Sequence, residues 1–90
     1  MAYRLDLRTL LLMLGHSTGH LYADLPRLQG VKSPCQIFLD LVKGSIVTGS
    51  VRDQQGNEII SGEAAVKLVR NHVLEWHFTA QQPKVFYGIN

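Results

Sequence analysis

Apolar residues are concentrated between residues 35 and 51, CQIFLDLVKGSIVTGSV, a stretch rich in Ile, Val, Phe and Thr with a break at Val42-Lys43-Gly44. Alternation rich in β-branched residues is typical of strands, and Gly44 can take the positive φ that a short hairpin loop requires. The pattern therefore predicts a β-hairpin around which the chain packs. The core side of its first strand is predicted to hold Cys35, Ile37, Leu39 and Leu41.

The second strand of this hairpin does not show which face is buried. Val47 and Val51 share one face with Gly49, while Ile46 lies on the other face with Thr48 and Ser50. A glycine inside a strand is typical of a bulge or of a closely approaching helix.

Two helices are predicted on either side of the hairpin. The first spans about residues 6–14, with Asp6 as N-cap and Gly15 as its stop. Leu12 and Met13 add apolar surface outside its main leucine stripe, so this helix needs a second partner, either the other helix or another subunit. The second helix spans about residues 62–72, is capped by Ser61, and has one face predicted to hold Ala65, Leu68, Val69 and His72.

Two further strands follow from alternation, one over residues 20–25 and one over residues 74–78 with Trp76 in the core. Residues 27–34 and 52–57 are predicted as loops, and 80–90 as a tail or an edge strand.

The predicted fold class is α+β, an antiparallel sheet of about four strands with two helices on one face. Ninety residues predict a single domain over 1–90 with its core at about 5–79.

The outer face of this sheet is predicted to gather aromatic, acidic and histidine side chains. Its members are His20, Tyr22, Phe38, Asp40, Glu75 and His77. Such a mixture suits a protein partner or stacking against single-stranded nucleic acid, and it also suits a solvated sheet face.

Charge and composition narrow the classes of function. Nine Lys and Arg against seven Asp and Glu give a net charge of +2, and the charges are scattered, which argues against a nucleic-acid binder. The apolar run at residues 10–14 is too short to cross a bilayer, and the single Cys35 forms no internal disulfide. We therefore expect a cytosolic protein that does not bind membranes.

Candidate chemistry is sparse. His16 and His20 have a metal-ligand spacing only if they share a helix, and Ser17-Thr18-Gly19 between them disfavours one. Cys35 begins an apolar strand, where a thiol usually packs as a small hydrophobe. Gly44-Ser45 and Gly49-Ser50 lack the glycine-lysine-hydroxyl order of a phosphate-binding loop. The sequence therefore predicts no catalytic residue, metal or cofactor and no enzyme.

The order of the elements resembles that of the PATAN-like domains, which are small modules associated with bacterial signalling proteins. The matching segments are Leu5-Asp6-Leu7 with Leu10-Leu11, Ser17 to Leu21, Ile37 to Leu39, Lys43 to Val47, Gly62 to Ala65, and Trp76 to Phe78. The segment from Pro26 to Pro34 is longer than the corresponding turn of that family. The resemblance implies a non-catalytic interaction domain without a cofactor.

Two functions follow as hypotheses. The first is a protein-interaction module of bacterial signalling that self-associates as a homodimer through Leu12 and Met13 and binds a further signalling protein. The second is a single-stranded nucleic-acid-binding domain that uses Tyr22 and Phe38 on the outer face. The predicted partner-binding residues are therefore these four.

Overall fold

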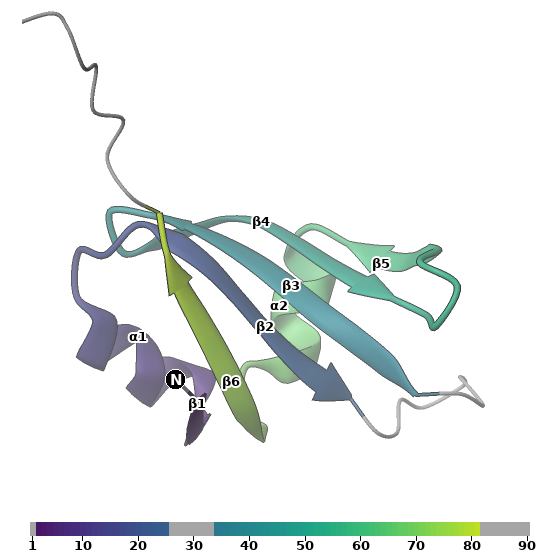
Figure 1. Ribbon diagram of the computed structural model, residues 1–90, viewed down its shortest axis with the longest axis horizontal. Helices are drawn as coiled ribbons and strands as arrows, with labels where there is room; N and C mark the ends of the chain where they lie inside the picture. Colours follow the sequence, from purple (N-terminus) through teal and green to yellow (C-terminus); the bar gives the residue numbers. More distant parts are fainter. Residues whose placement is uncertain (1, 26–33, 82–90) are drawn as a thin grey trace, which may run out of the picture.

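Six strands form one open antiparallel sheet in the computed structural model, which describes residues 2–25 and 34–81. The elements along the chain are β1 (Ala2–Asp6), α1 (Leu7–Leu14), β2 (Gly19–Leu25), β3 (Cys35–Val42), β4 (Ser45–Arg52), β5 (Glu58–Ser61), α2 (Glu63–Val69) and β6 (Val73–Ala80). The strand order across the sheet is β1-β6-β2-β3-β4-β5 (Figure 1). The α+β class is confirmed.

The predicted hairpin is present as β3 and β4. Lys43 and Gly44 form its two-residue loop with φ values of 50° and 84°, which is the pattern of a type I′ turn. The loop is held against the segment that follows α1, because the Gly44 N–H donates to the Ser17 carbonyl at 2.9 Å. A Cβ on Gly44 would overlap the carbonyl oxygen of Gly15, so the loop and the end of α1 require a glycine here.

A β-bulge explains why the faces of β4 were ambiguous. Ile46 pairs with Leu41 and Thr48 pairs with Asp40, so Val47 is an extra residue in the ladder. Ile46 therefore packs against the core while Val47 is exposed, contrary to the expectation that Val47 shares a face with Val51. Downstream of the bulge, residues 49, 50 and 51 are all buried, so the burial of β4 does not alternate there.

The helix α2 approaches the sheet at Gly49. Of the two expectations for this glycine, a bulge or a closely approaching helix, the second is confirmed. The Gly62 N–H donates to the Gly49 carbonyl at 2.8 Å. A Cβ on Gly49 would lie 3.2 Å from the Gly62 carbonyl oxygen and 3.3 Å from Cγ2 of Val66. The missing side chain thus lets the first turn of α2 lie directly on β4.

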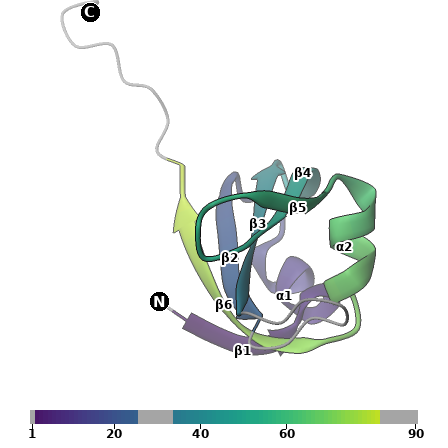
Figure 2. The same cartoon turned by 90° about the vertical axis from the view of Figure 1, so that its right-hand side faces the viewer.

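Both helices contribute to one core on the same side of the sheet (Figure 2). Leu7 and Leu10 enter it from α1, and Ala65 and Val69 enter it from α2. The predicted core residues of β3 are all buried, and Trp76 on β6 is fully buried. The Nε1 of Trp76 has no hydrogen-bond partner among the described residues.

The sheet has six strands, whereas about four were predicted, because the pattern of the sequence did not predict β1 and β5. Both are short edge strands, and they add only Tyr3, Leu5 and Ile60 to the border of the core. Ser61 lies in β5, so it does not cap α2, whose N-cap is Gly62 without a side-chain bond.

The first helix agrees with its prediction and the second is shorter than predicted. Asp6 caps α1 by accepting the Thr9 N–H at 3.1 Å, and Gly15 follows its last residue with φ 59°. The helix α2 ends at Val69, so His72 does not share its buried face and is exposed.

Parts of the predicted organisation fall on residues that are not described. The loop predicted over residues 27–34 lies outside the described residues except for Pro34, and so does the tail beyond Gln81. Within residues 2–25 and 34–81, no helix is long and apolar enough to span a bilayer.

Candidate functional site

The outer face of the sheet carries a row of contacting rings, one from each of three neighbouring strands. Tyr22 on β2 pairs in register with His77 on β6 and with Phe38 on β3. The Tyr22 and His77 rings stack with centroids 4.6 Å apart at 11°, and the Tyr22 and Phe38 centroids are 6.3 Å apart at 28°. The guanidinium carbon of Arg52 lies 5.2 Å from the Phe38 centroid, which is within cation–π range.

A polar row lies beside these rings. His20 Nδ1 is 2.5 Å from Asp40 Oδ1, and the Thr48 hydroxyl donates to Asp40 Oδ2 at 2.6 Å. These two hydrogen bonds lower the pKa of Asp40 below its ordinary value, and the bond from Thr48 has the larger effect. Alternation thus predicted correctly that these outer-face residues gather, and the structure adds Thr48 and Arg52 from β4.

This polar row does not have the order of a nucleophilic site. Such a site needs the hydroxyl on the imidazole, with the carboxylate on the far side of the ring. Here the Thr48 hydroxyl bonds the carboxylate itself. The row therefore ties β2, β3 and β4 together, and it borders a shallow hollow of about 250 Å³ that reaches to Arg52.

The opposite side of the molecule has a groove between α1 and α2, which we call the helix groove. It consists of two adjoining hollows of about 470 and 370 Å³. Both are lined by Leu11 of α1, Ile46 of β4, Val66 of α2 and Arg70 directly after α2. The floor is apolar, while Arg8 and Arg70 stand at its sides.

The predicted partner-binding residues of α1 line neither hollow of the helix groove and lie on the exposed surface of that helix. Leu12 is 79% exposed and Met13 is 61% exposed, the two highest values among the exposed large hydrophobic residues of the described chain. Neither packs against the core, whereas the preceding Leu11 does. The structure therefore separates the four predicted residues into two pairs, Leu12 and Met13 on the helix side and Tyr22 and Phe38 on the outer face.

A comparison with protein families gives one match. A family model described as Domain of unknown function (DUF8389) matches residues 3–84. The chain belongs to that family. No curated protein and no solved structure matches the chain. The family description does not mention PATAN-like domains, so that resemblance stays a prediction.

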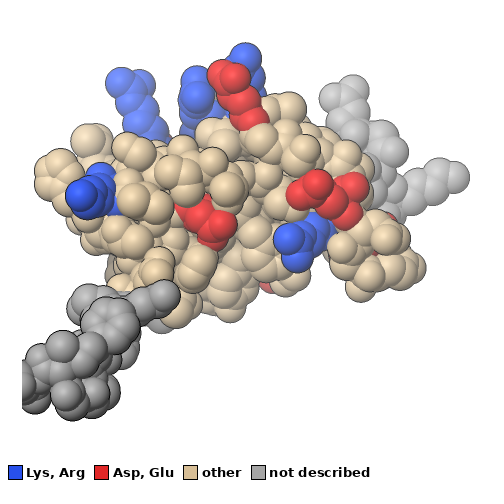
Figure 3. Space-filling view, turned by 90° about the horizontal axis from the view of Figure 1, so that it is seen from above, with Lys and Arg blue, Asp and Glu red and all other residues tan. Residues whose placement is uncertain are grey.

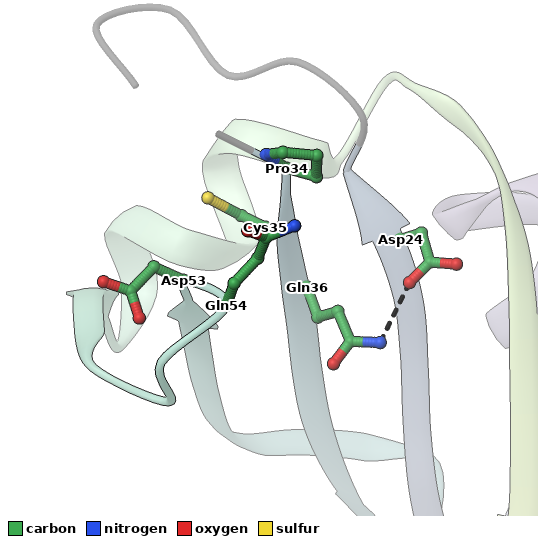
Figure 4. A pocket seen from close by; sticks show the side chains of 6 residues that line it. All are labelled: Asp24, Pro34, Cys35, Gln36, Asp53 and Gln54. Atoms are coloured by element: carbon green, nitrogen blue, oxygen red, sulfur yellow. Dashed lines mark hydrogen bonds between the residues drawn. The ribbon is translucent and has the colours of Figure 1, made fainter. Parts of the chain in front are cut away.

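A further hollow, of about 540 Å³, lies where β2 ends and β3 begins (Figure 4). Gln36 turns toward Asp24 and donates to its carboxylate at 2.9 Å. The Asp53 carboxylate accepts the backbone N–H groups of Gln55 and Asn57 and so holds the turn that leads to β5. Both carboxylates thus have structural roles, and Cys35 beside them is buried.

The histidines do not converge. His16 follows α1 and His20 lies in β2, so the pair does not share a helix face. Across the described ranges, no three His, Cys, Asp or Glu residues gather as metal ligands.

Proposed function

We propose that this protein is a non-catalytic protein-interaction module of bacterial signalling that self-associates through α1. The observation that carries the proposal is the exposure of Leu12 and Met13, two large apolar side chains adjacent on one short helix. Residues of this type are enriched where proteins associate. The assignment to signalling rests on the resemblance to PATAN-like domains.

The size of this apolar surface suits a concentration-dependent dimer. A two-fold interface uses each residue twice, so Leu12 and Met13 provide four side chains. Burying four such side chains is worth at most about 6–12 kcal/mol. Association costs about 4–15 kcal/mol, so these contacts alone give a weak dimer that further contacts strengthen.

Light scattering on a size-exclusion column tests self-association. The wild-type chain is expected to increase in mass over a concentration range of about a hundredfold, as mass action requires. The double variant Leu12→Glu with Met13→Glu should stay monomeric and keep its circular dichroism spectrum, because both positions are exposed.

Ile59→Glu is the matched control, since Ile59 is an exposed hydrophobic residue on β5 rather than on α1. Its mass should equal that of the wild type. Unchanged assembly of the double variant, or a wild type that is monomeric at every concentration, rejects self-association through α1.

Single-stranded nucleic-acid binding is the second candidate, and the stacked row of Tyr22, Phe38 and His77 favours it. Bases stack on exposed aromatic rings in such domains. The carboxylates of Asp24, Asp40 and Glu75 on the same face oppose a polyanion. A labelled oligothymidine should bind more weakly as salt rises and should lose binding when Tyr22 and Phe38 become alanine; a titration without salt-sensitive binding removes this candidate.

A further inference from the structure

We infer that the helix groove binds an amphipathic helix of a partner protein, one with aliphatic side chains along one face and carboxylates beside them. This inference rests on the proposed interaction function and supplies the chemistry of the further partner. The groove does not include Met13, which belongs to the proposed self-association surface. A variant at Met13 and a variant in the groove therefore test the two proposals separately.

The shape of the groove suits such a ligand. Its two hollows share Leu11, Ile46, Val66 and Arg70 and so run into one another. Their volumes, about 470 and 370 Å³, fall within the usual range of about 300–1,000 Å³ for binding pockets. An amphipathic helix places anchors at i, i+3, i+4 and i+7, which fill neighbouring hollows along an elongated apolar groove.

The positive charge at the groove indicates that the ligand carries carboxylates. Arg8 and Arg70 line it, are exposed, and form no ion pair with any described residue. The acidic Glu63 at the far end of the groove already lies 3.8 Å from Lys67. Figure 3 shows lysine and arginine side chains along the border of the molecule that lies behind the sheet in Figure 1, with acidic side-chain atoms among them.

Helical geometry shows how far this surface extends around α1. Successive residues are 100° apart, so Arg8 lies about 60° and Leu12 about 100° from Leu11 in the same direction. Met13 lies about 200° away, on the other flank of the helix. The groove surface therefore continues through Arg8 to Leu12 and excludes Met13.

The helix α1 of a second copy does not match this groove. Its sequence, LRTLLLML, contains no acidic residue and would bring a second Arg8 against the cations of the groove. The occupant that satisfies Arg8 and Arg70 is thus a helix with its own carboxylates, supplied by another protein.

Two synthetic peptides of about 18 residues, or five helical turns, test this inference on the full chain. Both carry leucines at i, i+3, i+4 and i+7; one has glutamate beside the leucines and the other has lysine at the same positions. Fluorescence anisotropy should show binding of the glutamate peptide and not of the lysine peptide. Arg70→Glu should weaken binding of the glutamate peptide by about tenfold or more, since it replaces an attractive charge pair at the interface by a repulsive one.

Lys43→Glu is the matched control, because it makes the same change from cation to carboxylate at an exposed residue that lines neither hollow. Lys67 would not serve, since its replacement would also release Glu63, which lines the groove. Lys43→Glu should change the affinity by less than about threefold, as expected for a charge outside the buried contact. Equal binding of the two peptides, no binding of the glutamate peptide, or equal effects of Arg70→Glu and Lys43→Glu overturns the inference.

Light scattering on the same variants separates the two proposals. Arg70→Glu should leave the assembly mass unchanged, and Met13→Glu should leave peptide affinity unchanged. A chain that is monomeric yet selects the glutamate peptide rejects only self-association. A dimer that does not discriminate between the peptides rejects only the groove ligand.

Discussion

The outer face of the sheet and the helix side of the molecule both expose large side chains, but they differ in what those side chains contact. On the outer face, Tyr22 stacks on His77 and Arg52 covers Phe38. On the helix side, Leu12 and Met13 project without packing on the core, and Arg70 forms no ion pair with a described residue. The outer-face residues contact one another and so tie neighbouring strands together, whereas the helix-side residues lack such contacts, and our proposals of a partner rest on them.

The strongest way to sharpen this comparison is to truncate two adjacent residues of β3 that face opposite sides. Leu39 is buried in the core, so Leu39→Ala should lower the free energy of unfolding by about 2–5 kcal/mol. Phe38 is half-buried among outer-face side chains, so Phe38→Ala should cost about 1 kcal/mol. Urea unfolding at neutral pH measures both, and equal losses would mean that the outer face is as important to stability as the core.

A smaller effect concerns the contact between the hairpin loop and the end of α1. Gly44→Ala should cost about 2–3 kcal/mol, because the new Cβ combines a positive φ with an overlap against the Gly15 carbonyl oxygen. Gly56→Ala is the control, since Gly56 has φ 86° and nothing within 4 Å of its Cβ position. It should cost only about 1–2 kcal/mol of conformational strain. Equal costs in thermal unfolding would show that the loop moves away from α1 without penalty.

The smallest effect concerns the polar row on the outer face. The pKa of Asp40 is lower in the folded chain than its ordinary value of 3.8, with the Thr48 hydroxyl as the largest cause. The resulting stability is therefore present above pH 3.8 and is lost as the pH falls through the lower folded pKa. Thr48→Val should raise the pKa of Asp40 in an NMR titration and reduce this loss in acid.

Thr79→Val is the control for that titration. Thr79 pairs with His20 in the register of β2 and β6 and is exposed. The described side chains that hydrogen-bond the Asp40 carboxylate are Thr48 and His20, not Thr79. The pKa of Asp40 should not change in this variant. A similar rise in both variants would show that the shift does not come from the Thr48 bond.

Most of the fold could be predicted because local patterns agreed with tertiary packing. The hairpin, α1 and the core side of β3 depend on alternation, a cap and a glycine turn, all of which are visible in the sequence. The strands β1 and β5 were missed because each is short and contributes little apolar surface, and β5 was obscured by the interpretation of Ser61 as a helix cap. The alternation of Tyr3 and Leu5 with the polar Arg4 was the available signal for β1.

The candidate sites were predictable to different degrees. Alternation placed Tyr22, Phe38 and His77 on one face, but their stacking depends on strand register, which pairs Tyr22 with both of the others. The exposure of Leu12 and Met13 followed from the helical wheel of α1. The helix groove was not predictable, since it exists only because α1, α2 and the bulged start of β4 approach one another.

The sequence by itself determined both helices, four of the six strands and, except in β4, which side of each is apolar, because these follow from the period of side chains along one element. Only the tertiary structure decided the strand order, the bulge that turns Ile46 inward and Val47 outward, and the position beside the helix groove of two arginines that form no ion pair with a described residue. These depend on contacts between residues far apart in the chain, such as Gly44 with Gly15 and Gly49 with Gly62, which no local period encodes.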